Sequence, residues 1–376
     1  MMTRPSVLSL VSYRVFPPLM GGQKCVVDFY EHLSPFATIT LAVAKDNKPE
    51  PKTNYQVEPF LFNHWGGDFN LIYIFRLLKL IKKNKVDFII IEHSYFGFLG
   101  IILRFFSKKK LIVRMHNIEG HRFRDMQKPW WWIYLQYEKW VCKKADHLWF
   151  TASTDYHFAI NEWKINATNC STLFYGIENK EIPTDIERIN CRKSIIEKNE
   201  LNENTKLFLF NGTLDYLPNT DALRIIIHEL LPRLAKRLLG FRIIICGNRI
   251  TDEWQYELEQ YPEIIFEGFV SDISSYYKGC DCFINPVTLG SGLKTKLVEA
   301  LANNIDIISV ESSTLAIDGI YSENKISLIE DYNWDAFVEA MSHHQNDGGH
   351  VTPAAFYEAF NWTQIIQKAL LSLQEL

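Results

Sequence analysis

The residues with the clearest chemistry are two lysines and a glutamate beside a glycine-rich turn. Lys294 and Lys296 follow the turn Gly290–Leu293, and Glu299 comes three residues after Lys296. Backbone N–H groups at the start of a helix bind phosphate, and lysine adds positive charge. A carboxylate accepts hydrogen bonds from sugar hydroxyls. This combination predicts a site for a nucleotide sugar on a helix that begins near Leu293.

Each of these residues also has a plain structural interpretation. Lys294 and Lys296 would then be solvated side chains, and the glycines an ordinary loop. Glu299 would be an exposed carboxylate that the helix dipole favours. The surrounding pattern favours the binding role.

The elements that must position these residues alternate between short apolar runs and amphipathic stretches, which favours an α/β fold with parallel sheets. The pattern runs once through the first half, is interrupted by the polar segment Glu178–Asn204, and then restarts. Predicted strands are Val7–Tyr13, Val86–Ile91, Lys110–Met115, Ala145–Ala152, Ser171–Tyr175, Leu207–Phe210, Phe241–Cys246, Ile264–Phe266, Asp281–Asn285 and Ile305–Val310. Predicted helices include 23–33, Asn219–Leu239 and Ala354–Leu373.

Two doubly wound domains follow from this repetition. We expect a first domain over residues 1–180, a second domain over residues 181–352 and a closing helix within residues 353–376. Ligands in such folds bind outside the carboxyl ends of the strands. The expected site is therefore a cleft between the strand ends of two Rossmann-like domains.

Several motifs at these strand ends resemble those of family 4 glycosyltransferases, which have the two-domain GT-B fold. The motifs are Pro18–Gly22, His116–Glu119, Tyr175–Glu178, Phe210–Asn219, Gly268–Asp272 and Gly290–Ala300. The resemblance extends over most of the chain. It implies transfer with retention from a nucleotide-diphosphate sugar, without a metal or other cofactor. It also implies that residues 181–352 bind the donor, that residues 1–180 bind the acceptor, and that the helix in residues 353–376 returns to the first domain. Our interpretation is that the acceptor is a glycan or lipid-linked oligosaccharide in cell-surface polysaccharide synthesis.

The resemblance also implies roles for individual residues. It places His116, Lys294 and Glu299 at the reacting centre, and Glu119 and Arg122 near the acceptor. A histidine or an arginine at these positions also has a structural alternative. The implied donor-binding residues are Gly21, Gly22, Gly212, Thr213, Arg249, Val270, Gly290, Ser291, Gly292, Leu293, Lys294, Lys296 and Glu299.

Three positions depart from the family pattern. Ser291 stands where the family often has a first glutamate, and Thr213 and Asn219 stand where it commonly has an arginine and a lysine. Lys294 and Lys296 are the expected replacements, because the diphosphate charge must still be balanced. These departures keep two alternatives open: a nucleotide-sugar epimerase of the same fold, and a non-catalytic donor-binding subunit of a transferase complex.

The first half of the chain is basic and rich in tryptophan. Residues 1–185 carry 24 Lys and Arg against 17 Asp and Glu, whereas the remainder carries 16 against 27. The triplet Trp130–Trp132 cannot direct all three rings to one side of a helix, and Lys82, Lys83 and Lys108–Lys110 lie in nearby runs. Peripheral contact with an anionic membrane surface is one interpretation. A buried aromatic cluster with solvated lysines is the other.

The cysteines bear on metal binding and on location. Seven cysteines are scattered without the paired spacing of a zinc site, which favours reduced thiols and no metal. No uncharged run approaches the length of a membrane span. We therefore expect a cytoplasmic protein, with the inner face of the membrane as its alternative location, and no nucleic-acid partner.

Overall fold

The computed structural model describes residues 4–49, 53–63, 70–179, 181–290, 292–345 and 350–376. The chain forms two compact units, each built on its own parallel sheet. The first unit contains residues up to Gly176 and the final segment from Ala359, and Gly292 and Leu293 are grouped with it. The second unit contains the rest of the chain from Ile177 to Glu358.

The first sheet has seven strands in the order β3-β2-β1-β4-β5-β6-β7, and every pairing is parallel. The order reverses between β1 and β4, which is the switch point where doubly wound folds bind ligands. The strands are β1 (Ser6–Leu10), β2 (Thr38–Ala44), β3 (Gln56–Leu61), β4 (Phe88–Glu92), β5 (Lys110–Met115), β6 (His147–Phe150) and β7 (Cys170–Thr172).

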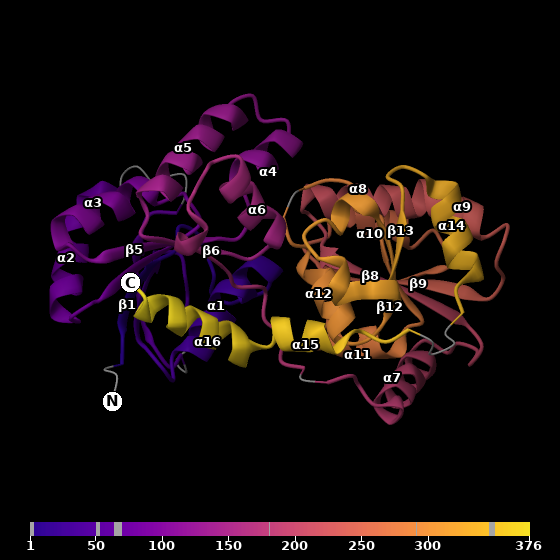
Figure 1. Cartoon of the computed structure of the whole chain (residues 1–376). Coiled ribbons are helices and arrows are strands. Elements are labelled where there is room, and N and C mark those ends of the chain that lie inside the picture. The colour runs from indigo at the N-terminus through magenta and orange to yellow at the C-terminus, as the bar shows by residue number, and fades with distance from the viewer. Residues whose placement is uncertain (1–3, 50–52, 64–69, 180, 291, 346–349) are drawn as a thin grey trace. The chain divides into compact units, whose positions relative to one another are not determined.

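Helices cover both faces of this sheet (Figure 1). Successive side chains of β6 point to opposite faces of the sheet. Leu148 and Phe150 belong to the core on the face covered by α5. Trp149 points to the other face, where it packs against Phe29 of α1 and donates a hydrogen bond to Ser372 of α16. The helices are α1 (Gly21–Leu33), α2 (Ile74–Lys83), α3 (Gly97–Ser107), α4 (Glu119–Asp125), α5 (Trp131–Lys144), α6 (Ser153–Asn161) and α16 (Trp362–Gln374).

The second sheet has six parallel strands in the order β10-β9-β8-β11-β12-β13, so its switch point lies between β8 and β11. Its strands are β8 (Lys206–Thr213), β9 (Phe241–Asn248), β10 (Ile264–Gly268), β11 (Cys282–Asn285), β12 (Asp306–Val310) and β13 (Ile326–Ile329). The helices from the second half are α7 (Asp185–Lys198), α8 (Leu217–Ile225), α9 (Leu231–Leu234), α10 (Asp252–Leu258), α11 (Ser274–Gly279), α12 (Thr295–Ala302), α13 (Gly319–Ser322), α14 (Trp334–His343) and α15 (Ala354–Phe360).

The predicted α/β class with two doubly wound parallel sheets is confirmed, and so is the strand Lys110–Met115 with the same bounds. Strands β2, β3 and β13 lie outside the predicted set. β3 and β13 are the edges of their sheets, where partly exposed strands give a weaker apolar signal. β2 is buried, but its small Ala and Thr side chains dilute the signal.

Two segments predicted as single helices are divided in the structure, so these predictions are wrong. The expected helix Asn219–Leu239 is instead α8, a π-helical segment Ile226–Leu230, and α9, which ends at Leu234. Pro232 lacks the N–H that an α-helix needs there, so the helix widens just before it. The expected helix Ala354–Leu373 is divided at Asn361, whose side chain accepts the N–H of Thr363 and caps α16.

Candidate functional site

A glycine turn at the carboxyl end of the second sheet leads into α12. Gly290 and Gly292 have φ values of +84° and +83°, a region that favours glycine. Lys294 is the residue before the first helical turn, and its Nζ donates to the carbonyl of Gly290. The helix thus begins at Thr295, two residues later than predicted. Ser291 lies outside the described residues.

Lys296 lies in the first turn of α12 and is partly buried. Its Nζ donates to Asn219 Oδ1 at 2.7 Å and lies 4.6 Å from the centre of the Phe210 ring. Burial and the nearby charge of Lys294 lower the pKa of Lys296 to about 7, although the Glu299 carboxylate opposes this shift. The structure therefore holds a titratable cation next to the helix start.

Asn219 links this lysine to the end of β8. Its Nδ2 donates to the carbonyl of Thr213 at 2.9 Å. A Cβ atom at Gly212 would lie 2.6 Å from the same Nδ2, so a larger residue would displace Asn219. Gly212 and Thr213, both predicted donor-binding residues, therefore hold Asn219, which in turn holds Lys296.

Glu299 lies one turn further along α12, next to a buried tyrosine. The hydroxyl of Tyr277 donates to Asn211 Oδ1 at 3.0 Å and lies 3.1 Å from the carbonyl of Lys296. Burial and the charge of Glu299 raise the pKa of Tyr277 well above its usual value. The sequence did not single out Tyr277, since a tyrosine in a short helix carries no distinguishing pattern.

The remaining predicted donor residues are Arg249 after β9, Val270 after β10 and Leu293 just before α12. Arg249, with a φ of +59°, forms a 2.7 Å ion pair with Asp215. The charge of Arg249 is therefore already balanced by a carboxylate. Val270 is partly buried in the loop after β10, beside the exposed ring of Phe269, and Leu293 is also partly buried.

In the first unit, His116 follows β5 and lies over the end of β4. Its Nε2 is hydrogen-bonded to Glu92, a fully buried carboxylate that also accepts from Tyr30 at 2.6 Å and pairs with Arg114 at 3.2 Å. Burial alone would raise the pKa of Glu92, but Arg114 and the hydrogen bond from His116 hold it at about 2. Glu92 is therefore an ionised acceptor.

His116 is neutral in this setting. Burial and the neighbouring His93 ring, stacked at 4.2 Å, lower the pKa of His116 to about 4. Because Glu92 accepts from Nε2, the proton of the neutral ring is assigned to Nε2 and the lone pair to Nδ1. His116 can thus accept a hydrogen bond from a hydroxyl through Nδ1.

The two predicted acceptor residues form one cluster with Tyr95. Glu119 is 1% exposed, and it accepts from Arg122 Nε and from Tyr95, both at 2.7 Å. Its other oxygen lies 3.1 Å from His93 Nδ1. Arg122 Nη2 also donates to Tyr95 at 2.8 Å and is the more accessible partner. Glu119 therefore orients Arg122, which is the more exposed side chain of this pair.

A further buried acidic side chain, Glu138 of α5, anchors this cluster on the side of α5. It accepts the backbone N–H groups of Glu119 at 3.1 Å and Gly120 at 3.0 Å, and the hydroxyl of Ser94 at 2.9 Å. Burial raises the pKa of Glu138 to about 8. Sequence reasoning missed Glu138, which reads as an ordinary helix-surface glutamate.

Gly21 and Gly22 begin α1 at the end of the loop that follows β1. Gln23 closes this turn by accepting the N–H groups of Leu19 at 2.8 Å and Met20 at 3.0 Å. A Cβ atom at Gly22 would meet nothing within 4 Å. Packing therefore does not require glycine at position 22, and the predicted close approach of a ligand stays a prediction beside the alternative of a plain tight turn.

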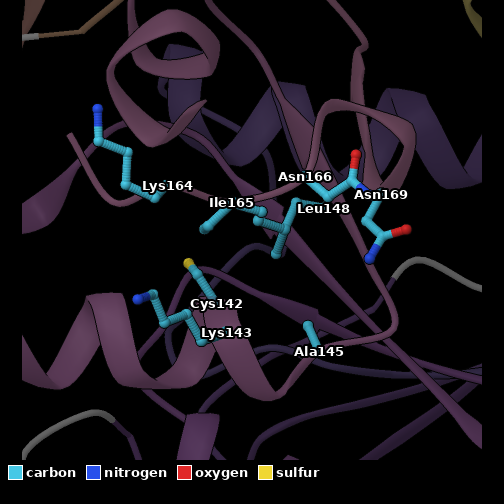
Figure 2. A pocket seen from close by; sticks show the side chains of 8 residues that line it. All are labelled: Cys142, Lys143, Ala145, Leu148, Lys164, Ile165, Asn166 and Asn169. Atoms are coloured by element: carbon cyan, nitrogen blue, oxygen red, sulfur yellow. The ribbon is translucent and has the colours of Figure 1, made fainter. Parts of the chain in front are cut away.

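A separate pocket of about 300 Å³ lies near the amino ends of β6 and β7 in the first sheet (Figure 2). Its lining includes Cys142 of α5, Leu148 of β6 and Lys164. Most of its lining residues come just before β6 or β7 in the chain, at the amino ends of these strands. His116, in contrast, follows the carboxyl end of β5. The pocket is therefore distinct from the candidate site.

Among the described residues, no three His, Cys, Asp or Glu side chains are grouped to hold a metal ion. Likewise, none of the described helices has the length and apolar character needed to cross a membrane. All seven cysteines are free thiols.

Comparison with known proteins gives a match on each half of the chain. A family model described as "Glycosyltransferase Family 4" matches residues 21–178, and one described as "Glycosyl transferases group 1" matches residues 205–347. A search of curated proteins finds no match.

Solved structures of the same fold cover nearly the whole chain. Sucrose-phosphate synthase from Thermosynechococcus elongatus is 14% identical over 98% of both chains, with a TM-score of 0.75. HepE of Anabaena in complex with UDP is 15% identical over 99% of this chain and 100% of its own, with a TM-score of 0.74. WaaG, a glycosyltransferase involved in lipopolysaccharide biosynthesis, is 12% identical over 96% of this chain and 98% of its own, with a TM-score of 0.67.

Proposed function

Because the chain belongs to the family 4, or group 1, glycosyltransferases, we propose that it transfers a hexose with retention from a nucleotide-diphosphate sugar. The acceptor is a glycan or lipid-linked oligosaccharide of a cell-surface polysaccharide. The observation that carries the proposal is the cation at the start of α12, where Lys296 is held beside Asn219 and near Glu299.

The donor binds to the second domain. Its diphosphate lies against the turn that includes Gly290, Gly292 and Leu293, and its charge is balanced by Lys294 and Lys296. Glu299 accepts hydrogen bonds from ribose hydroxyls, and the base packs near Val270. HepE of Anabaena was solved with UDP and with UDP-glucose, which supports a uridine nucleotide as the donor.

The reaction forms one bond and breaks one. The acceptor hydroxyl oxygen bonds to the anomeric carbon as the bond from that carbon to the β-phosphate oxygen breaks, and the hydroxyl proton passes to the departing phosphate. The chain contributes positioning and charge: Lys294 and Lys296 stabilise the leaving diphosphate. In this scheme lysines supply the positive charge, so no metal is required.

The first domain binds the acceptor and the transferred sugar. His116, kept neutral with Nδ1 as an acceptor, receives a hydrogen bond from a sugar hydroxyl. Arg122, oriented by Glu119, binds a polar group of the acceptor. Because lipid-linked acceptors lie at a membrane, we place the first domain at the inner membrane surface.

A thermal-shift screen with UDP-, GDP- and ADP-sugars tests the donor assignment. We expect UDP-sugars alone to raise the melting temperature, by an amount that grows with ligand concentration. Lys296→Gln should weaken this shift. Stabilisation by another nucleotide class would overturn the choice of base, and no stabilisation by any sugar nucleotide would overturn the donor site.

Product analysis separates transfer from the two alternatives. Thr213 and Asn219 depart from the family pattern, so a non-catalytic donor-binding subunit is one of the alternatives to test. Wild type should release UDP slowly from a UDP-sugar, and Glu299→Ala should abolish this release. An isomerised sugar nucleotide without acceptor would favour an epimerase, and binding without any turnover would favour the subunit.

A further inference from the structure

An aromatic face covers one side of the first domain and is unrelated to the residues assigned to the donor. Helices α2, α3 and α5 lie next to one another on that side (Figure 1). Large apolar side chains project outward from two of these helices. We call Phe98, Phe105, Phe106, Trp132, Ile133 and Trp140 the aromatic face.

On α5, the exposed residues follow helical spacing. Ile133 and Trp140 are seven residues apart and therefore share one side of the helix, and Trp132 lies beside them. Trp132 is 56% exposed, which no buried cluster would allow. The interpretation of the tryptophan triplet as a buried aromatic cluster is therefore wrong for Trp132.

On α3, a second row continues the same surface. Phe98 and Phe105 are also seven residues apart, and Phe105 is 64% exposed. The rings of Phe98 and Trp140 lie 6.4 Å apart and join the two rows. Exposed rows of large apolar side chains on two adjoining helices are unusual on a surface that faces only water.

Lysines gather at the C-terminal ends of these helices. Lys108 lies over the Phe105 ring at 4.6 Å, and Lys143 and Lys144 end α5. Lys82 and Lys83 end α2, next to α3. Asp146, which follows α5, is already paired with Arg104 and Lys110. The lysines therefore add positive charge at these helix ends.

We propose that the aromatic face is a docking surface for an anionic lipid bilayer. Tryptophan favours the boundary between acyl chains and headgroups, where its ring is apolar and its N–H remains hydrated. Lysines beside such residues bind the negative headgroups. A second copy of this chain would present the same lysines to one another, so like-charge repulsion disfavours it as the occupant.

Docking through α5 also bears on the acceptor. Glu138 projects from α5 and holds the start of α4, which carries Arg122. A membrane bound by α5 is therefore linked through one helix to the proposed acceptor residues. Only this link depends on the proposed function; the docking surface itself does not.

Vesicle sedimentation of the full chain tests the proposal without donor or acceptor. We expect binding to phosphatidylcholine vesicles that contain phosphatidylglycerol, and much weaker binding to phosphatidylcholine alone. High salt should reduce binding, because headgroup attraction is screened. The double variant Trp132→Ser/Ile133→Ser should bind at least about tenfold more weakly, and Lys143→Gln/Lys144→Gln should lose part of the salt-sensitive binding.

The matched control is Leu239→Ser, which removes an exposed apolar side chain from the second unit and should bind like wild type. The UDP-sugar thermal shift should be unchanged in every variant, which separates a docking failure from a failure of the donor site. No binding to either vesicle, or equal loss in the control, would overturn the proposal. A dimer that dissociates in the double variant would assign the face to a second copy instead.

Discussion

Lys296 Nζ donates to Asn219 Oδ1 at 2.7 Å, which joins the first turn of α12 to the first turns of α8. The family resemblance predicts a lysine at position 219, where this chain has asparagine. In this chain the nearby cation comes from α12, and Asn219 is its hydrogen-bond partner. In the proposed donor site, Lys296 therefore supplies the charge expected from position 219.

Removal of this charge should weaken donor binding without unfolding the protein. A hydrogen bond between a charged group and its partner contributes about 1.5–3 kcal/mol, so Lys296→Gln should weaken UDP-sugar binding by about 10- to 150-fold. Isothermal titration calorimetry measures the change. Lys193→Gln, an exposed lysine on α7, is the control. Unchanged affinity in Lys296→Gln would remove Lys296 from the site.

Donor affinity should depend on pH through the same lysine. The pKa of Lys296 is about 7, so the ammonium is charged below this pH and loses its proton above it. The diphosphate binds the charged form of Lys296. Affinity for the UDP-sugar should therefore fall between pH 7 and pH 9, by at most about tenfold for each pH unit. Titrations of a UDP-sugar across this range should show a slope in wild type and none in Lys296→Gln. A slope that persists in the variant would assign the titration to another group.

The buried network under His116 should make a large contribution to stability. Glu92→Gln leaves Arg114 without its carboxylate partner, and breaking a buried pair from one side costs about 3–5 kcal/mol. Urea unfolding followed by tryptophan fluorescence measures the loss. Glu358→Gln, an exposed substitution on α15, should have little effect.

The contribution of Glu92 to the free energy of unfolding should also depend on pH. The folded pKa of Glu92 is about 2, below the ordinary value of 4.5, so its contribution is present above pH 4.5 and lost as the pH falls toward 2. The stability difference between wild type and Glu92→Gln should therefore shrink over that window. A constant difference would show that the carboxylate charge is not responsible.

Glu138 should act as a positioning residue for the acceptor cluster. Glu138→Gln replaces one carboxylate oxygen with an amide that cannot accept, so one of the N–H groups of Glu119 or Gly120 loses its partner. Hydrogen exchange in residues 119–125 should accelerate, and stability should fall by about 1–3 kcal/mol. Glu162→Gln, at the exposed end of α6, is the matched control. Unchanged exchange in this segment would show that Glu138 does not anchor α4.

The sequence by itself determined the class of fold and the segments that carry chemistry. Continuous apolar runs predicted strands such as Lys110–Met115, because a strand covered on both faces must be apolar throughout. The glycine turn before Lys294 and the pair Lys296 and Glu299 were also visible, since these residues are neighbours in the chain. Local spacing is enough for such features.

Only the tertiary structure decided which side chains meet. Lys296 and Asn219 are 77 positions apart, and His116 and Glu92 are 24 apart, so no periodic pattern connects them. Glu138 follows the pattern of a surface helix, yet α5 packs it against the start of α4. Local periodicity fixes the faces of a helix or strand, but the partner of a buried polar group depends on how distant elements pack together.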